Sequence, residues 1–326
     1  MRQHRAMLEQ MASGFMPARV LLTALELDVF TACGAGAATA EELARRTGAR
    51  PAPLARLLNA LAALGLLDKR GDRYRATPPA RTHLIAGRPG YLGDIMRHRA
   101  SMWERWSDLT AIVRTGRVPP RAFTKERERR FIKGMANLGA SAAPACARAL
   151  RRELAGARRL LDIGGGPAVY ACELARAWPK LSVVVLDLPG PLAYARETIA
   201  AYGLARRVSV KAGDVCAARS FGRGFDVAFM SSLIHSFKPA VVAEVIRKAA
   251  GALRPGGFLA VKEFFIDPGR ASPPFTALFS INMLVAGAGD VYTRGEVEGW
   301  MRAAGVRPVR YVDLPQFSGI VVGRRL

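Results

Sequence analysis

Hydrophobic positions in the second half of the chain follow a repeating pattern. Short apolar runs such as RRLLDIGGG, LSVVVLDLP and FDVAFMSSL have the length of buried strands, and apolar residues at helical spacing follow each run. A late helix and two closing strands, RPVRYVDLP and GIVVGRRL, complete the series. Repeated strand–helix units predict a parallel sheet with right-handed crossovers, and therefore an α/β domain over residues 151–326.

The first half of the chain has helical periodicity and one compact motif. Apolar spacing over residues 17–31 predicts a helix. Thr39 and Glu42 then have the spacing of a capping box, which opens a short helix that Gly48 ends. A leucine stripe in PLARLLNALAALGLL predicts the next helix, and the tight turn at Gly71 predicts a hairpin after it.

Helix, turn, helix and hairpin together are typical of a winged helix. We expect a winged-helix-like domain over residues 1–100, used for packing or dimerisation, and a helical linker over residues 101–150. A winged helix can also bind DNA through its second helix, which here carries Arg56 and Asn59 among leucines. A winged-helix DNA-binding regulator therefore stays open as the less favoured alternative.

Composition limits the other classes of function. The formal net charge is +23, from 49 basic and 26 acidic residues, which first suggests nucleic acid. The excess is spread over both halves, and only eight of the basic residues are lysines, so biased codon usage explains it as well. No apolar run approaches the roughly 18 residues of a membrane span, and no signal-peptide core is present. We expect a cytoplasmic protein that binds neither membrane nor nucleic acid.

Cysteine spacing argues against metal and disulfide chemistry. Cys33, Cys146, Cys172 and Cys216 lie far apart and form no CxxC pair. Neither a zinc site nor a disulfide framework is expected.

Polar residues at the predicted strand ends indicate the ligand, because such sheets bind ligands at the carboxyl ends of their strands. Gly164 and Gly166 fit the start of a G-x-G-x-x-G loop, but Val169 takes its last place, so the pyrophosphate motif fails. Asp187 follows about 20 residues later, where an acid accepts from ribose hydroxyls. Asp214 can accept from the amine of adenine. An adenosine ligand without phosphates is indicated, and S-adenosylmethionine fits.

His235 directly follows the fourth predicted strand of this half, and none of the other three histidines has such a position. If the methyl group of S-adenosylmethionine is transferred to a hydroxyl group, a phenol is a suitable example of the acceptor. A phenol with a pKa near 10 is mostly protonated at neutral pH, whereas its oxyanion is the better nucleophile. A neutral imidazole can take the proton during methyl transfer, which typically contributes about 10²–10⁴-fold. His235 is therefore the candidate general base.

The motifs LLDIGGG, VVLDLP, AGDV and LRPGG, in this order before the two terminal strands, resemble those of class I S-adenosylmethionine-dependent methyltransferases. With the helical front end and His235, the chain resembles the small-molecule O-methyltransferases related to caffeic acid O-methyltransferase and to bacterial polyketide- and pigment-tailoring enzymes. The resemblance implies a Rossmann-like seven-stranded methyltransferase sheet with an N-terminal all-α/winged-helix dimerisation domain. It also implies a homodimer that methylates a hydroxyl of a small aromatic metabolite in secondary metabolism.

The resemblance also implies that the helical linker over residues 101–150 lines the active site, and it assigns roles to single residues. It makes Glu263 the acid that orients His235. The residues expected to bind the cofactor are Asp162, Gly164, Gly165, Gly166, Asp187, Leu188, Gly213, Asp214, Val215 and Ser231. The residues expected to bind the acceptor are Trp103, Phe131, Met135, Phe275, Phe279 and Met283. For Trp103, Phe279 and Met283, packing in the core is an alternative explanation.

Four positions depart from the family pattern. Ala168 stands where a further glycine is usual, and alanine does not take a left-handed turn cheaply. Ser236 and the following phenylalanine replace the usual Asp-Trp after the base, and Val291 replaces a second acidic partner. A C-methyltransferase, or a non-methylating relative that uses the same cofactor pocket, is therefore the alternative function, and the acceptor and the methylated position stay open.

Overall fold

The computed structural model describes residues 2–122, 124–287, 289–315 and 317–326, which divide into two compact units. The first unit holds the residues up to Trp103 together with Lys125–Asn137, and the second holds Glu104–Thr124 and Leu138–Leu326. Helix α10 (Lys125–Ala149) contributes its first part to one unit and its remainder to the other.

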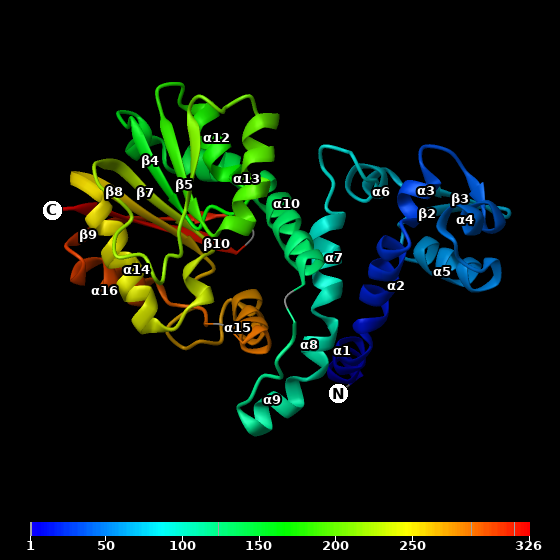
Figure 1. Cartoon of the computed structure of the whole chain (residues 1–326). Coiled ribbons are helices and arrows are strands. Elements are labelled where there is room, and N and C mark those ends of the chain that lie inside the picture. The colour runs from blue at the N-terminus through cyan, green and yellow to red at the C-terminus, as the bar shows by residue number, and fades with distance from the viewer. Residues whose placement is uncertain (1, 123, 288, 316) are drawn as a thin grey trace. The chain divides into compact units, whose positions relative to one another are not determined.

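The first unit consists of short helices and a small antiparallel sheet of order β1-β3-β2 (Figure 1). Besides the start of α10, its elements are α1 (Arg2–Ser13), α2 (Phe15–Glu26), α3 (Val29–Cys33), β1 (Ala38–Thr39), α4 (Ala40–Thr47), α5 (Pro51–Ala63), β2 (Leu67–Arg70), β3 (Arg73–Ala76), α6 (Pro78–His83) and α7 (Gly93–Ser101).

Local sequence signals explain most of these elements. The capping box is confirmed, because the Glu42 N–H donates to Thr39 Oγ1 and the Thr39 N–H donates to Glu42 Oε2. The prediction of one helix over 17–31 is wrong, because Asp28 has a φ of 55° and separates α2 from α3. Aspartate tolerates this left-handed conformation better than most residues. The apolar spacing continues across the break because both helices face the same core.

The winged-helix arrangement of helices and hairpin is confirmed, but its second helix is poorly suited to reading DNA. Asn59 Oδ1 accepts hydrogen bonds from Lys69 Nζ and from the Tyr74 hydroxyl, each at 2.9 Å. Its amide is therefore engaged with the hairpin, and Leu54, Leu58 and Leu61 are buried in the unit's own core. These contacts favour a packing role for α5.

The second unit is an α/β domain. Its elements are α8 (Trp103–Ser107, which starts at the boundary), α9 (Leu109–Thr115), the end of α10, α11 (Arg151–Leu154), β4 (Arg159–Ile163), α12 (Val169–Ala177), β5 (Ser182–Asp187), α13 (Pro189–Ala201), β6 (Val208–Ala212), β7 (Phe225–Ser231), the 3₁₀ turn η1 (Ile234–Ser236), α14 (Pro239–Ala252), β8 (Leu253–Glu263), α15 (Pro274–Ala286), α16 (Arg294–Ala303), β9 (Val306–Leu314) and β10 (Ser318–Arg325).

A seven-stranded sheet of order β6-β5-β4-β7-β8-β10-β9 organises this unit. Strands β4 to β8 run parallel, and β10 pairs antiparallel with both β8 and β9. The strand order reverses between β4 and β7, where such sheets bind their ligands. The predicted α/β class and the two closing strands are confirmed.

Helices cover both faces of the sheet (Figure 1). Successive residues of a strand face opposite sides, so Leu160 lies in a core with α12 and α13, whereas Leu161 lies in a core with α14 and α16. We call these the α12-side core and the α14-side core. Apolar burial on both faces fixes the strands and leaves polar residues for their carboxyl ends.

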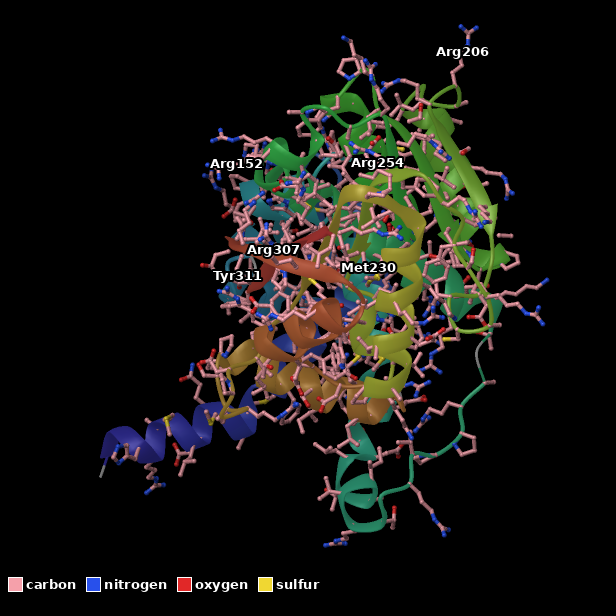
Figure 2. The ribbon with its side chains drawn as sticks, turned by 90° about the vertical axis from the view of Figure 1, so that its left-hand side faces the viewer. Arg152, Arg206, Met230, Arg254, Arg307 and Tyr311 are labelled. Carbon is pink, nitrogen blue, oxygen red and sulfur yellow. The ribbon has the colours of Figure 1, made fainter. Side chains whose placement is uncertain are left out.

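The basic residues are dispersed over the second unit. Figure 2 shows Arg152, Arg206, Arg254 and Arg307 on separate parts of its surface. Some are neutralised locally, as where Arg254 pairs with Asp226. Such dispersion agrees with a diffuse arginine excess. None of the described helices is long and apolar enough to cross a membrane.

Candidate active site

The carboxyl ends of the parallel strands bring the predicted polar residues to one edge of the sheet. Asp187, Ser231 and Glu263 are the last residues of β5, β7 and β8. Asp214 follows β6, and His235 lies in η1 after β7. Asp162, also expected to bind the cofactor, is the penultimate residue of β4 and so lies within its strand.

The glycine loop after β4 has the backbone that its composition requires. Gly164 and Gly166 have φ values of 68° and 51°, in the left-handed region that favours glycine. A Cβ atom at Gly165 would lie 2.6 Å from a carboxylate oxygen of Asp162. The loop therefore brings its backbone against β4 and leaves no room for a side chain at Gly165.

Ala168, which precedes α12, takes the left-handed turn that we expected it to resist. Its φ is 61° and its side chain is fully buried. A non-glycine residue in this conformation is strained by about 1–2 kcal/mol. Packing in the α12-side core holds the residue there despite this strain.

The carboxylate of Asp187 connects this loop to β5. Its Oδ2 accepts from the Gly166 N–H and its Oδ1 from the Leu188 N–H, each at 2.7 Å. Burial raises the pKa of Asp187, and the two backbone hydrogen bonds oppose that shift. The carboxylate is thus fixed in place, while further lone pairs remain for a ligand's hydroxyl groups.

The turn after β6 is held from both sides. The Gly213 N–H donates to the Asp187 carbonyl at 2.9 Å, and Asp214 Oδ1 accepts from the Cys216 N–H at 2.8 Å. The buried Lys248 of α14 donates to the carbonyl oxygens of Val215 and Cys216. Lys248 was not among the predicted site residues, because it is distant in sequence and acts on this turn through the turn's backbone.

Two buried polar atoms at the strand ends have no hydrogen-bond partner among the described residues. They are Oδ2 of Asp162 and the hydroxyl oxygen of Ser231. Burial, together with the nearby charge of Asp187, raises the pKa of Asp162 to about 7. Unsatisfied buried polar atoms are rare in folded proteins and require an explanation. A ligand with an adenosine end and a polar amino-acid end fits this set of glycines, acids and unpaired atoms.

His235 and Glu263 form a hydrogen-bonded pair at the ends of β7 and β8. The distance between His235 Nδ1 and Glu263 Oε2 is 2.9 Å. Glu263 also accepts from the N–H groups of Ile234 and Phe264. The side chains of His235 and Glu263 are only 13% and 4% exposed. The backbone hydrogen bonds fix the carboxylate, which in turn fixes the ring.

The charge state of Glu263 determines what His235 can do. Burial alone would raise the pKa of Glu263, but the neighbouring His235 and Lys262 and the Phe264 N–H together lower it. An ionised carboxylate only accepts hydrogen bonds, so Nδ1 of His235 carries a proton and donates it. In the neutral ring Nε2 is then the free acceptor. Such a nitrogen can take a proton from a bound hydroxyl group.

Aromatic side chains surround this base. The ring of Phe279 lies edge-on to His235 with a centroid distance of 5.0 Å. Phe264 contacts both Phe279 and Phe275, at 5.0 and 5.2 Å. Phe264 was not among the predicted residues, because its contact with α15 depends on which face of the chain it occupies after β8. Met283 of α15 is buried.

The other predicted acceptor residues, Trp103, Phe131 and Met135, lie in the first unit. There the ring of Phe131 packs edge-on against His98 at 5.2 Å. Their role toward the acceptor stays a prediction.

The position expected for a second acidic partner has a structural role. Val291 is buried, and Asp290 accepts from the Ser280 hydroxyl at 2.6 Å and from the Val291 N–H at 2.7 Å. Among the described residues, Glu263 is the only acid hydrogen-bonded to His235. The same residues contain no group of three or more His, Cys, Asp or Glu side chains that could hold a metal ion.

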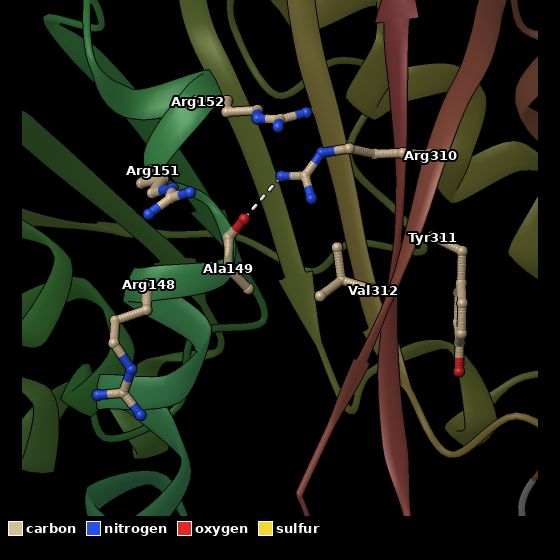
Figure 3. Close-up of a pocket in the computed structure, with 7 residues that line it drawn as sticks. All are labelled: Arg148, Ala149, Arg151, Arg152, Arg310, Tyr311 and Val312. Atoms are coloured by element: carbon tan, nitrogen blue, oxygen red, sulfur yellow. Dashed lines mark hydrogen bonds between the residues drawn. The ribbon is translucent and has the colours of Figure 1, made fainter.

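A separate hollow in the second unit, with a volume of about 380 Å³, lies between the end of α10, α11 and β9 (Figure 3). Arg148, Arg151, Arg152 and Arg310 line it. Arg310 is anchored by Glu153 at 2.6 Å and by the Ala149 carbonyl, the bond drawn in Figure 3. None of the predicted site residues lines this hollow.

Comparisons with known proteins identify the family of the chain. The family model of the O-methyltransferase domain matches residues 106–307, and that of the O-methyltransferase dimerisation domain matches residues 9–86. The 3-hydroxy-5-methyl-1-naphthoate 3-O-methyltransferase of Streptomyces sahachiroi is 35% identical, over 97% of this chain and 94% of that protein. The tetracenomycin polyketide synthesis 8-O-methyltransferase TcmO of Streptomyces glaucescens is 30% identical, over 97% and 95%.

A solved structure extends the similarity to the fold. The structure of an O-methyltransferase family protein from Burkholderia thailandensis is 28% identical to this chain, with a TM-score of 0.86. The match covers 98% of this chain and 97% of that one.

Proposed function

The chain belongs to the O-methyltransferase family of S-adenosylmethionine-dependent enzymes, and we propose that it methylates a hydroxyl group of a small aromatic metabolite with His235 as the general base. The observation that carries the base is the 2.9 Å hydrogen bond between His235 and the buried Glu263. It leaves Nε2 of a neutral ring free at the carboxyl end of β7.

The cofactor is S-adenosylmethionine, which supplies a methyl group already activated on a sulfonium. We assign the loop Gly164–Gly166 and Asp187 to its ribose side, and the turn Gly213–Val215 to its adenine. Leu188 follows Asp187 and is half exposed, so its side chain is available to the adenine face. Asp162 and Ser231, with their unpaired atoms, remain for the amino-acid end.

His235 contributes by holding and removing a proton. A hydroxyl group that donates to Nε2 becomes more nucleophilic as its proton leaves, which is typically worth about 10²–10⁴-fold in rate. Glu263 acts through His235, because it fixes the ring and stabilises the imidazolium that forms. Alignment of the hydroxyl oxygen with the methyl group supplies much of the remaining rate enhancement.

An aromatic acceptor fits the rings beside the base. Phe264, Phe275 and Phe279 offer faces and edges against which a flat ring can pack. Relatives named for a naphthoate and for tetracenomycin support a polyketide-like or pigment-like acceptor. We keep Trp103, Phe131, Met135 and Met283 as further acceptor-binding candidates.

A homodimer formed through the first unit is part of the proposal. Large apolar side chains of α1 and α2 are exposed, namely Met7 (47%), Leu8 (61%), Met11 (71%), Phe15 (58%) and Met16 (52%). Exposed apolar groups of this size commonly mark an interaction surface. A variant that combines Met11→Glu and Phe15→Glu should sediment as a monomer. Leu64→Glu, at the exposed leucine that caps the C-terminal end of α5, should sediment as a dimer. Dimers of the double variant would contradict the assignment.

The experiment that tests the function uses S-adenosylmethionine with a deuterated methyl group and a panel of phenols, naphthols and hydroxynaphthoates. We expect a product in which the labelled methyl group replaces a hydroxyl proton, as tandem mass spectrometry shows. Label on carbon would indicate the C-methyltransferase alternative. Cofactor binding without transfer to any panel member would favour a non-methylating relative.

A further inference from the structure

Lys262 is a buried lysine that the proposed mechanism does not use. It precedes Glu263 at the end of β8, and its register partner on the neighbouring strand is Ser231. Only 3% of its surface is exposed. A lysine is rarely buried to this extent without a partner.

The ammonium of Lys262 is surrounded mainly by aromatic rings. Its Nζ lies 5.8 Å from the ring centroid of Tyr170 and 5.5 Å from that of Phe264. The described residues give this Nζ no hydrogen bond and no ion pair, although an ammonium has three protons to donate. Burial lowers the pKa of Lys262, while the neighbouring Glu263 opposes that shift.

Lys248, the other buried lysine of this unit, has hydrogen-bond acceptors for its ammonium. Its Nζ donates to the carbonyl oxygens of Val215 and Cys216, at 3.1 and 2.9 Å, and lies 3.9 Å from Glu244. The described residues therefore supply acceptors to the ammonium of Lys248 and none to that of Lys262. A bound anion would supply an acceptor to the second ammonium.

The strand alternation places Lys262 with the two unpaired polar atoms of the site. Leu160, Phe229 and Ala260 belong to the α12-side core. The residues two positions further along the same strands are Asp162, Ser231 and Lys262, which therefore face the same side. β4, β7 and β8 are consecutive strands of the sheet, so an acid, a hydroxyl and an ammonium follow one another along its edge.

Their order matches one end of the cofactor. If Asp187 and the turn after β6 hold the adenosine, the amino-acid end extends along the sheet in the opposite direction, over β4, β7 and β8. That end carries an ammonium and a carboxylate on the same carbon. Asp162 can receive the ammonium and Lys262 the carboxylate.

We propose that Lys262 binds the carboxylate of the cofactor's amino-acid end, opposite an Asp162 that binds its ammonium. The inference rests on the proposed function only in that S-adenosylmethionine binds at these strand ends. Lys262 is then a cofactor-binding residue that makes the site select ligands with an intact amino acid.

The test compares two ligands that differ only in this carboxylate, S-adenosylhomocysteine and its decarboxylated analogue, by titration calorimetry. The wild-type protein should bind S-adenosylhomocysteine roughly 10- to 100-fold more tightly, the value of a hydrogen bond to a charged group. In Lys262→Met this preference should disappear, because the affinity for S-adenosylhomocysteine falls while that for the analogue stays the same. Lys262→Arg should retain part of the preference, and Lys180→Met, at an exposed lysine, should retain all of it.

Several results would overturn the inference. Equal affinity of the wild-type protein for both ligands would do so without any variant, and so would an equal loss for both ligands in Lys262→Met, which indicates a structural role only. If neither ligand binds the wild-type protein, the cofactor site itself is misplaced. Transfer to the phenol panel with an unchanged ligand preference would leave the proposed function intact and reject only the role of Lys262.

Discussion

The two sides of the sheet's strand switch hold their functional groups in different ways. On the cofactor side, at the ends of β4 to β6, backbone N–H groups fix the acids, as Gly166 and Leu188 fix Asp187. On the base side, at the ends of β7 and β8, backbone N–H groups fix only Glu263, and the Glu263 side chain fixes His235, which lies far away in sequence. We infer that the cofactor side, together with Ser231 and Lys262, determines cofactor affinity, and that the His235–Glu263 pair determines the rate.

The largest expected effect comes from removing the base. His235→Ala should lower kcat by about 10²–10⁴-fold, the usual contribution of a general base. The affinity for S-adenosylhomocysteine should change less than threefold, because the proposal gives His235 a role toward the acceptor and none toward the cofactor. Steady-state assays with the best acceptor of the panel measure kcat, and titration calorimetry measures the affinity for S-adenosylhomocysteine. Ser236→Ala, at an exposed residue next to His235, is the control and should behave as wild type. If His235→Ala lowered cofactor affinity as much as it lowers kcat, the proposed division between affinity and rate would be wrong.

The opposite pattern should follow a change on the cofactor side. Asp187→Asn should weaken S-adenosylhomocysteine binding by about 10- to 100-fold, because a hydrogen bond to a charged acceptor is worth about 1.5–3 kcal/mol. At saturating cofactor the single-turnover rate should stay within about threefold of the wild-type value. Glu197→Gln, at an exposed acid of α13, should behave as wild type. If Asp187→Asn bound S-adenosylhomocysteine normally but reacted slowly, Asp187 would act in methyl transfer together with His235 and not in cofactor binding.

The cofactor side was predictable from sequence because its chemistry is local. The glycine loop and Asp214 follow their strands and Asp187 ends β5, and a parallel sheet places all these strand ends at one edge. The position of His235 followed from the same rule. Glu263 was expected only through the resemblance to known methyltransferases, because its pairing with His235 depends on β7 and β8 being neighbours.

The roles of the remaining residues depend on tertiary contacts, which the local sequence pattern does not reveal. Phe264 and Lys262 gain their roles from the face of the chain on which they lie, and Lys248 from a contact between α14 and a distant turn. The left-handed residues Asp28 and Ala168 are set by packing, which overrides the local preference of the chain. The first breaks a helix that apolar spacing alone predicts as continuous.

The pH dependence of cofactor affinity should separate the sides further. Burial and the charge of Asp187 raise the pKa of Asp162 to about 7, and a cationic ligand group prefers the ionised carboxylate. Affinity for S-adenosylhomocysteine should therefore rise by up to about tenfold per pH unit below pH 7 and level off above it. Calorimetry between pH 5.5 and about 8.5 measures this. Asp162→Asn should flatten the profile, and a persistent slope in that variant would assign the titration to another group.

The smallest expected effect concerns the strain at Ala168, on the cofactor side. Ala168→Gly should raise the free energy of unfolding by about 0.5–1 kcal/mol, because glycine relieves the left-handed strain but loses more chain entropy on folding. Ala171→Gly, within the regular part of α12, should lower it by about 1 kcal/mol. Urea denaturation measures both, and a loss of stability in Ala168→Gly would show that the alanine packing outweighs the strain.

The dependence of rate on acceptor acidity tests the role of His235 most directly. Single-turnover rates of the wild-type protein and of His235→Ala are compared over a series of phenols whose pKa values fall from about 10 to below the assay pH. We expect the wild-type protein to react about 10²–10⁴-fold faster than His235→Ala with the least acidic phenol. For phenols that are already ionised, which need no base, the advantage should shrink toward onefold. An advantage that is the same for every phenol would contradict proton removal by His235.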